Sequence, residues 1–483
     1  MMDAPGKKVA GETSASVRLE RAREAVRLSP SDPALLNNLG LVLHDCGDYD
    51  EAIRVYESTL VLVPASGAVY YNLGNTVRAK GDPAGAVTLY QKALSYGTAV
   101  PEVYNNLGLA WQECGCPDRA HEAFRTALKR DPHYVPAGLN YAYALIQGAR
   151  PEEAEAALRS VLRNQPDCVD AHWLLSHALL LQGKYEEGWP EYEWRWQKMS
   201  AASYRRTDPA RRWTGGEIPG ARRILLYAEQ GLGDAIQFIR FAPLVEARGG
   251  KVAVECHREL VSLFRHVEGV SEVYARGEEI PETDVECPLL SLPGALGTTR
   301  DTIPAAVPYV WPDRSRVERW RDRCVDGSGR ARVGLVWAGN PGHRNDANRS
   351  LPPEHLGAFA GCEGVQLFSL QKGEGGDMRL VKPSGLVLEE LGPALQDVED
   401  TAAVMVHMDL IITVDTAVAH LGGAMGRPVW MLVPFSPDWR WLLGRDESPW
   451  YPTMKLFRQG EPGSWGAVIA RVLAELKIWR DSP

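Results

Sequence analysis

The first two hundred residues carry a hydrophobic pattern that repeats every 34 positions. Three kinds of position keep this interval, a Leu-Gly pair, an alanine and an aromatic ring: Leu39-Gly40, Leu73-Gly74 and Leu107-Gly108; Ala52, Ala86 and Ala120; Tyr56, Tyr90 and Phe124. Small residues let two antiparallel helices approach closely, and the aromatic side chain fills the space between them. The pattern therefore predicts an α-solenoid over residues 16–200, with five helical hairpins after a half unit that ends at Pro30.

Stacked hairpins of this kind form a superhelix with a long concave groove. Asparagines recur near the start of each first helix: Asn37, Asn38, Asn72, Asn75, Asn105, Asn106 and Asn140. A carboxamide can both donate to and accept from an extended peptide backbone. Two interpretations stay open, a peptide-binding groove and a set of solvated or locally capping side chains. The repeat resembles the tetratricopeptide family, which implies a protein or peptide partner in the groove.

Two features near the repeats invite a functional interpretation that we do not favour. Asp48-Tyr49-Asp50 matches a D-x-D metal motif, but it lies in the turn between two repeat helices. Four aromatic residues gather with Arg195 within residues 188–196, and we expect them to pack the repeats onto the next domain rather than to stack on a ligand. Residues 201–221 are predicted to be a linker.

From Arg223 onward, short apolar runs alternate with helical segments, which is typical of an α/β domain with a parallel sheet. After the first run comes G-L-G-D, in which Gly231 and Gly233 are expected to allow a tight turn and Asp234 to open the helix. An aspartate at this place is either a helix N-cap or a carboxylate in the crevice where such sheets bind ligands. Residues 222–312 are predicted to form a first Rossmann-like lobe.

Residues 313–462 are predicted to form a second Rossmann-like lobe. Three cations follow its expected strands, and they suit a diphosphate or are ordinary surface residues: Arg344, Arg349 and Lys372. The sequence of residues 409–432 predicts a buried strand, then a sharp turn, then a helix with small residues. The backbone N–H groups of Thr416 and Ala417 are expected to bind phosphate at the positive helix end without a metal, with His420 one turn along.

Two motifs carry a resemblance to a known family. G-L-G-D before an amphipathic helix, and D-T-A-x-x-H-L at residues 415–421, resemble the heptosyltransferase-like glycosyltransferases and, more loosely, the O-linked N-acetylglucosamine transferases, which also carry tetratricopeptide repeats. The resemblance implies a glycosyltransferase-B fold over residues 222–480, with the acceptor side on the first lobe and the nucleotide-sugar donor side on the second. It also implies a final helix at 463–480 that returns to the first lobe. The first lobe is shorter than in that family, so the acceptor site does not transfer.

The resemblance also implies roles for individual residues. Asp234 takes the role of general base. Thr416, Ala417 and His420 contact the donor phosphates, and Asp415 caps the turn or holds a donor hydroxyl. Gly231, Gly233, Arg344 and Lys372 complete the expected donor site. Arg349 matches the family's basic residue in part, because Ser-Leu-Pro follows it.

A late stretch is rich in aromatic and basic residues: Trp439, Arg440, Trp441, Arg445, Trp450 and Tyr451. Aromatic rings stack on nucleotide bases, and Arg pairs with phosphate or carboxylate, so a pocket for the donor base is one interpretation. Packing of the two lobes against each other is the other.

Composition narrows the class of protein. A formal net charge of -9 argues against binding to a nucleic-acid backbone. No segment approaches the ~20 apolar residues of a membrane span, and the start of the sequence lacks the apolar run of a secretory signal, so a cytoplasmic location is expected. The eight cysteines are scattered and form no C-x-x-C pair, which predicts reduced thiols rather than a zinc site.

These observations together predict a metal-independent, inverting glycosyltransferase of bacterial type, whose repeats recruit a protein acceptor or partner. It needs no cofactor beyond a nucleotide-sugar co-substrate. One alternative is an inactive scaffold that has kept the fold without turnover. Another is an enzyme acting on a glycan or small molecule, with repeats that serve only for assembly. The sequence does not identify the sugar, the base or the acceptor.

Overall fold

The computed structural model describes residues 6–198, 209–218, 220, 222–343, 345–373 and 385–481. Contacts between residues divide the chain into two compact units, Met1–Leu174 and Leu175–Pro483. The division falls inside one helix, so the last predicted hairpin lies in the second unit, whereas the sequence pattern places the end of the repeats at residue 200.

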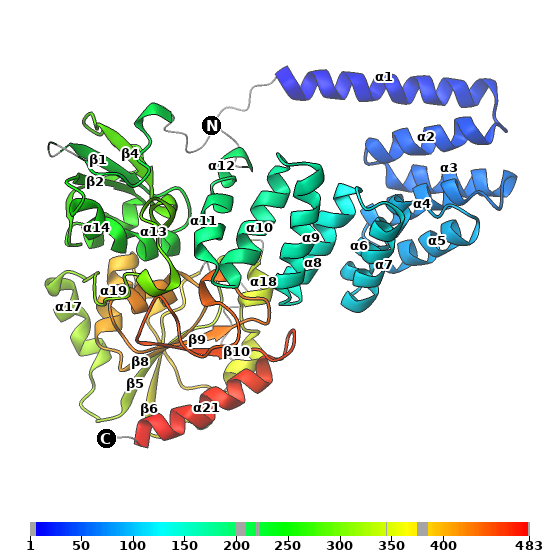
Figure 1. The fold of residues 1–483 in the computed structure, drawn as a ribbon. Helices are drawn as coiled ribbons and strands as arrows, with labels where there is room; N and C mark the ends of the chain where they lie inside the picture. The colour runs from blue at the N-terminus through cyan, green and yellow to red at the C-terminus, as the bar shows by residue number, and fades with distance from the viewer. Residues whose placement is uncertain are drawn as a thin grey trace. The chain divides into compact units, whose positions relative to one another are not determined.

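The first unit is entirely helical and follows the predicted 34-residue spacing (Figure 1). Its helices are α1 (Gly6–Leu28), α2 (Pro33–Asp45), α3 (Tyr49–Leu62), α4 (Gly67–Ala79), α5 (Pro83–Ser95), α6 (Pro101–Glu113), α7 (Pro117–Arg130), α8 (Val135–Gln147), α9 (Pro151–Asn164) and the first part of α10 (Val169–Leu181). Asp48 caps α3 by accepting from the backbone N–H of Glu51 at 3.3 Å, and Asp50 pairs with Lys80 at 2.6 Å. Both aspartates of the D-x-D sequence therefore have structural partners.

The glycine–aromatic pairs explain the spacing of the repeats. A Cβ atom on Gly40 would lie 2.5 Å from the ring of Tyr56, and one on Gly74 would lie 2.7 Å from the ring of Tyr90. Both rings are fully buried, so each first helix must carry glycine where the ring of its second helix crosses. The predicted helical solenoid is confirmed.

The recurring asparagines bond to one another between successive first helices. The Nδ2 atom of Asn72 donates to Asn37, that of Asn106 donates to Asn75, and that of Asn140 donates to Asn105, each over 2.9 Å. The contacts join α2 to α4, α4 to α6 and α6 to α8. Neither interpretation offered by the sequence included this ladder. The rung between α4 and α6 has further partners inside the chain, because Asn106 also donates to the hydroxyl of Tyr71 at 3.0 Å and Asn75 also accepts from that of Tyr90 at 2.8 Å.

The second unit contains two separate parallel sheets. The first has the order β3-β2-β1-β4, with helices between β1 and β2 and between β2 and β3. Its elements are β1 (Arg223–Tyr227), α13 (Leu232–Phe238), α14 (Ala242–Glu246), β2 (Lys251–Cys256), α15 (Val261–Phe264), β3 (Val270–Ala275), β4 (Val285–Pro288) and α16 (Leu292–Ala295). In the helical segment after β1, the side chains of Ile236, Ile239 and Phe241 are fully buried.

The second sheet has the order β10-β9-β8-β5-β6-β7. Its elements are α17 (Arg314–Cys324), β5 (Ala331–Val336), α18 (Asp346–Arg349), β6 (Val365–Ser369), β7 (Glu389–Glu390), α19 (Val398–Val406), β8 (Leu410–Val414), α20 (Ala417–Ala424), β9 (Val429–Val433), β10 (Met454–Arg458) and α21 (Trp465–Asp481). The central strands β8 and β9 are buried along their whole length, as expected where helices cover both faces of a parallel sheet.

The final helix does not return to the first sheet, so that prediction is wrong. The buried face of α21, with Trp465, Val468 and Val472, packs in the core of the second sheet together with Trp430 and Phe457. Only a short connection separates the end of β10 from the start of α21 (Figure 1). The apolar face of α21 therefore packs on the sheet to which β10 belongs.

Part of the predicted linker is packed rather than extended. Trp213 is buried and its backbone N–H donates to the carbonyl oxygen of Glu286 at 2.9 Å, while Arg212 forms an isolated parallel bridge with the same residue. Arg212 and Trp213 thus lie at the edge of the first sheet beside β4, and the segment continues to Ile218, whose backbone N–H donates to the carbonyl oxygen of Arg248 at 2.7 Å. Residues 199–208 lie outside the described part of the chain.

The aromatic segment that ends the repeats packs within the second unit. It forms α11 (Tyr185–Tyr192) and α12 (Arg195–Lys198). The ring of Trp189 meets that of Trp439 edge to face at 5.4 Å. The buried guanidinium of Arg195 pairs with Glu229, just beyond β1, at 2.9 Å. The segment therefore packs against protein groups, as the sequence analysis expects.

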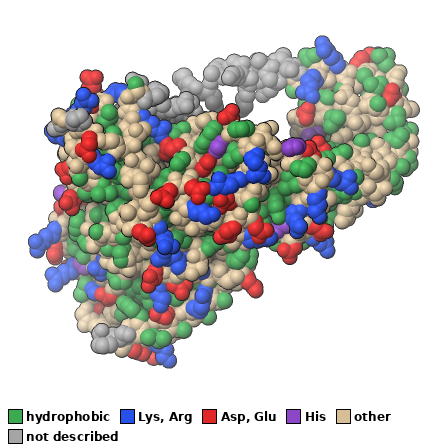
Figure 2. Space-filling view, in the orientation of Figure 1, with side chains coloured by type: hydrophobic (Ala, Val, Ile, Leu, Met, Phe, Trp, Pro, Cys, Tyr) green, Lys and Arg blue, Asp and Glu red, His purple; other side chains and the backbone are tan. Residues whose placement is uncertain are grey.

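Two surface properties bear on partners. On the face shown in Figure 2, basic and acidic side chains are interspersed rather than separated by sign. Among the described helices, none is both long and apolar enough to cross a lipid bilayer.

Candidate functional site

Two strand-to-helix turns, one from each sheet, meet in the second unit. The turn after β1 leads into α13, the turn after β8 leads into α20, and the two helices pack against each other. A Cβ atom on Gly233 would lie only 2.7 Å from Cδ2 of His420. Gly231 and Gly233 both lack the positive φ that would require glycine, so the expected reason for Gly233 is wrong. It is needed for close packing.

Asp234 is the third residue of α13 rather than its N-cap, which is Gly231. Its Oδ2 atom accepts from the backbone N–H of Gly231 at 2.9 Å, in the manner of a capping box. Its Oδ1 atom accepts from Arg440 at 2.6 Å. With 22% of its side chain exposed, Asp234 keeps access to solvent. The capping and functional interpretations are therefore compatible, because each oxygen has a second lone pair.

Arg440 connects the two sheets through a buried guanidinium. Its side chain is 8% exposed and stacks over the ring of Trp439 at 4.3 Å. Its Nε donates to Oε1 of Gln237 at 2.7 Å, and its Nη1 donates to Asp438 at 2.8 Å. Burial opposes its charge, but Asp438 and Asp234 outweigh that effect and raise the pKa of Arg440 above its usual value. All three nitrogens of the guanidinium are thus engaged.

His420 lies buried on the first turn of α20. Its Nδ1 atom is 2.9 Å from the hydroxyl of Tyr451, and its ring lies 5.3 Å from that of Trp441. Burial, helped by the charge of Arg440, lowers the pKa of His420 to about 3. A neutral imidazole has one N–H donor and one acceptor nitrogen. Such a ring can position a ligand oxygen, but it is not an acid at neutral pH.

The pKa values of two neighbouring carboxyl groups, Asp415 and Asp438, are shifted in opposite directions. Burial, helped by the nearby charge of Asp438, raises the pKa of Asp415 to about 6. Burial alone would also raise the pKa of Asp438, but the ion pair with Arg440 outweighs it and lowers that pKa. The Oδ2 atom of Asp415 accepts from Nε1 of Trp441 at 2.9 Å, so this carboxyl holds the loop that carries Arg440.

The start of α20 is suited to an anion. Thr416 is its N-cap residue, and the Thr416 side chain makes no capping hydrogen bond. The first backbone N–H groups of a helix point outward with partial positive charge and can bind a phosphate oxygen. Thr416 and Ala417 are partly exposed, so these N–H groups are within reach of solvent.

The predicted cations are placed differently from one another. Arg349 lies at the end of α18 and pairs with Asp346 at 3.3 Å. Its positive charge partly offsets the raised pKa of Asp415 and adds to the lowering of the His420 pKa that burial causes. Lys372 instead donates to the carbonyl oxygen of Gln396 at 3.2 Å, on the segment before α19. Arg344 lies outside the described residues.

The aromatic residues of the late stretch pack the two sheets together. Trp441, Trp450 and Tyr451 are fully buried, and the ring of Trp450 meets that of Phe238 at 5.8 Å. The guanidinium of Arg240, from the first sheet's helical layer, donates to the carbonyl oxygen of Trp450 at 2.5 Å. The packing interpretation is therefore the one that these side chains satisfy.

Sequence reasoning missed the role of Arg440 and Asp438. Arg440 stood among the candidates for a base pocket, while its partner Asp234 lies 206 residues away along the chain. The only local signal was the sequence Asp-Trp-Arg-Trp at 438–441, a charged pair between aromatic residues. Across the portion that the structure describes, no cluster of His, Cys, Asp or Glu has the arrangement of a metal site.

The repeats of this chain match known family models, and a larger part of the chain is similar to one curated protein. Residues 31–99 and 115–178 match family models described as Tetratricopeptide repeat. Protein FlbA of Caulobacter vibrioides is 28% identical over 326 residues, which cover 62% of this chain and 53% of FlbA. The chain thus spans about half the length of this curated relative.

Solved structures with similarity cover about a third of the chain. YrrB, described as a TPR protein with an unusual peptide-binding site, is 18% identical with a TM-score of 0.33, over 38% of this chain and 95% of YrrB. MamA is 23% identical with a TM-score of 0.30, over 34% of this chain and 96% of MamA. By the family matches and the repeated helical hairpins, the first part of this chain is composed of tetratricopeptide repeats.

Proposed function

We propose that this chain is a glycosyltransferase that moves a sugar from a nucleotide-diphosphate sugar to an acceptor hydroxyl, with inversion and without a metal. Its two sheets are interpreted as the lobes of a glycosyltransferase-B fold. In this proposal the repeats hold the protein that carries the acceptor, or a partner that delivers it.

The observation that carries the proposal is the meeting of α13 and α20. A partly exposed carboxylate, Asp234, comes from one sheet, and an uncapped helix start at Thr416 comes from the other. Inverting transfer needs a base near the acceptor hydroxyl and a positive site for the departing phosphate. The contact between Gly233 and His420 brings the two groups to one place.

Each residue has a defined task in this mechanism. Asp234 takes the proton of the acceptor hydroxyl. The proton goes to a lone pair of Oδ1 or Oδ2 that is not bonded to Arg440 or Gly231. The N-terminus of α20 stabilises the negative charge that develops on the leaving diphosphate. Arg349 adds positive charge nearby, and neutral His420 offers a hydrogen bond without competing for the proton.

The asparagine ladder supports the repeats' part of the proposal. Its asparagines recur along α2, α4, α6 and α8, and a carboxamide can both donate to and accept from an extended peptide backbone. Tetratricopeptide repeats most often bind other proteins through their concave surface.

Nucleotide binding tests the donor site directly. The melting temperature is measured in EDTA with millimolar UDP, GDP, ADP or CMP. A ligand at about a hundredfold over its dissociation constant stabilises the folded state by roughly 2.7 kcal/mol, so one nucleotide should raise the midpoint clearly. Arg349→Met should weaken that shift, while Lys455→Met, which removes an ion pair with Glu475 on β10 and α21, should not. If none of the four nucleotides shifts the midpoint, the donor site is refuted.

An inactive scaffold is the second candidate, and one observation favours it. Both carboxylate oxygens of Asp234 accept hydrogen bonds from protein groups, which is what a purely structural aspartate would do. Turnover of the nucleotide sugar by wild type but not by Asp234→Asn, with equal nucleotide binding by both, would exclude the scaffold. Equal behaviour of the two proteins in every assay would favour it.

A further inference from the structure

The repeats place matched residues where consecutive hairpins form a groove. On the first helices α4, α6 and α8 the matched positions hold Tyr70, Tyr104 and Gly138, each 34 residues apart. At the ends of the second helices α5, α7 and α9 they hold Tyr96, Arg130 and Asn164. The three grooves can therefore be compared position by position.

In two of the grooves the chain fills the space with its own planar groups. The rings of Tyr70 and Tyr96 stack at 5.4 Å with an interplanar angle of 14°. The guanidinium of Arg130 lies over the ring of Tyr104 at 5.0 Å. In both of these grooves, a tyrosine of the first helix is thus covered by a planar group from the end of the second helix.

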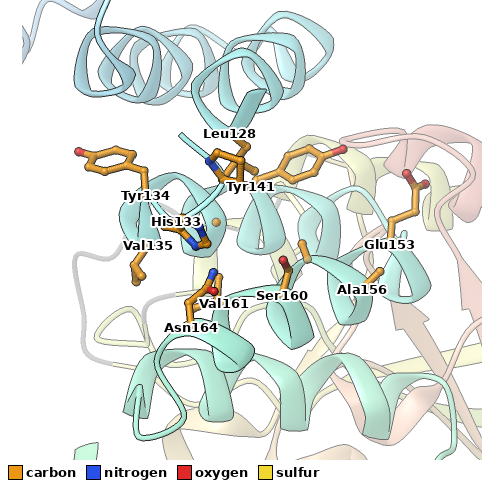
Figure 3. A pocket seen from close by; sticks show the side chains of 13 residues that line it. Leu128, His133, Tyr134, Val135, Tyr141, Glu153, Ala156, Ser160, Val161 and Asn164 are labelled. Atoms are coloured by element: carbon orange, nitrogen blue, oxygen red, sulfur yellow. The ribbon is translucent and has the colours of Figure 1, made fainter. Parts of the chain in front are cut away.

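In the third groove both fillers are missing. Gly138 has no side chain, Asn164 is short, and a cavity of about 340 Å³ opens between α7, α8 and α9. Figure 3 shows Leu128 and Tyr141 on one side of it and Ser160 and Val161 on the other. Its volume lies within the range of about 300–1,000 Å³ found for ligand pockets.

The chain cannot close this cavity by a change at Gly138 alone. A Cβ atom there would lie 2.5 Å from Cγ2 of Val161. The positions that match Val161 in the other two grooves are Ala93 and Ala127, which leave room for their tyrosines. The valine and the glycine are therefore a matched pair that keeps the groove free of an internal ring.

The lining defines the chemistry of an occupant. Its lining is largely apolar or aromatic, with Leu128, Val135 and Tyr141, and includes the polar side chains of His133 and Asn164. Glu153 is the one acid among the lining residues, and Arg150 already holds it by two bonds of 2.6 and 2.7 Å. The cavity thus favours an uncharged ring over a guanidinium.

We propose that the cavity between α7, α8 and α9 binds an aromatic side chain of a protein partner, which takes the place that Tyr70 and Tyr104 occupy in the neighbouring grooves. The site is distinct from the asparagine ladder and does not depend on any transferase activity. It gives the repeats a second point of contact that selects a particular residue type, beside a groove that tolerates many sequences.

The test compares small probes on the full chain by saturation-transfer NMR. N-acetyl-tyrosinamide is the aromatic probe and N-acetyl-leucinamide the aliphatic one. The triple substitution Gly138→Tyr, Val161→Ala, Asn164→Arg rebuilds the filling seen at Tyr104, Ala127 and Arg130. Wild type should give a strong signal for the aromatic probe alone, and the triple variant should lose it.

A second pair of variants guards against misfolding of the triple variant. Ala156→Trp enters the cavity from the exposed face of α9, whereas Thr88→Trp, at the matched exposed position of α5, leaves the cavity open. The first should abolish the signal of the aromatic probe, and the second should keep it. Equal signals from wild type and Ala156→Trp would overturn the proposal, as would no signal from wild type or a preference for the aliphatic probe.

Discussion

The Nη2 atom of Arg440 lies 2.6 Å from Oδ1 of Asp234. Asp234 follows a strand of the first sheet, and Arg440 follows a strand of the second. The same guanidinium also binds Gln237 and Asp438, so one side chain holds the helix of the first sheet to a loop of the second. The carboxylate of Asp234 is thus held by a group that belongs to the layer of the other sheet.

Replacing Arg440 by Met should destabilise the protein strongly. It would leave Asp234 and Asp438 without their cation, and breaking a buried ion pair by removing one partner costs about 3–5 kcal/mol. Urea unfolding measures the loss. Replacing Lys455 by Met at its exposed pair with Glu475 should cost at most about 1 kcal/mol. Equal costs for the two substitutions would show that Arg440 does not join the sheets.

Substituting Gly233 by Ala should disturb the meeting of the two helices. The added Cβ would lie 2.7 Å from the His420 ring, and overpacking of this kind costs about 1–3 kcal/mol. Thermal unfolding should show the loss, and nucleotide-induced stabilisation should weaken with it. Gly460→Ala is the control, because a Cβ there would meet nothing within 4 Å. A wild-type midpoint for Gly233→Ala would contradict the close packing.

The carboxyl of Asp415 should make stability fall as the pH rises. Its folded pKa of about 6 lies above the ~3.9 of an unfolded aspartate, so the folded state holds the proton more tightly. The stabilisation is fully present below about pH 4 and is lost as the pH rises through about 6. Asp415→Asn keeps an oxygen for Trp441, and it should remove this fall in a series of melting temperatures between pH 4 and 8.

His420 should contribute the opposite slope. Its folded pKa of about 3 lies below the ~6.5 of an unfolded histidine. The stabilisation is therefore present above about pH 6.5 and is lost as the pH falls towards 3. In His420→Asn, stability should depend less on pH between 4 and 6.5 than in wild type. An unchanged profile would mean that the imidazole is not buried in its neutral form.

The periodic and apolar parts of the fold were predictable from the sequence. Glycine and tyrosine 16 residues apart, as in Gly40 and Tyr56, fix a hairpin locally, and runs such as 223–227 and 410–414 can only be buried strands. The edge strand β4 was missed because it has four residues and ends in proline. The destination of α21 was wrong because its apolar face fits either sheet, and proximity to β10 decides between them.

The candidate site was predictable one half at a time. The turns at Asp234 and Thr416 each carry a local signature, since a strand, a small residue and a helix follow in order. The joining residue, Arg440, carries no such signature. Its role depends on a contact across 206 residues, and composition or spacing cannot reveal a contact of that kind.

The hydrogen bond from Arg240 to the backbone of Trp450, with the rings of Phe238 and Trp439 around it, has a consequence for how the second unit comes apart. These buried contacts join helices of the first sheet to loops of the second, so unfolding of one sheet removes packing partners from the other. Calorimetry of residues 175–483 should therefore show one cooperative transition, and a protease that cuts between the sheets should leave neither half folded.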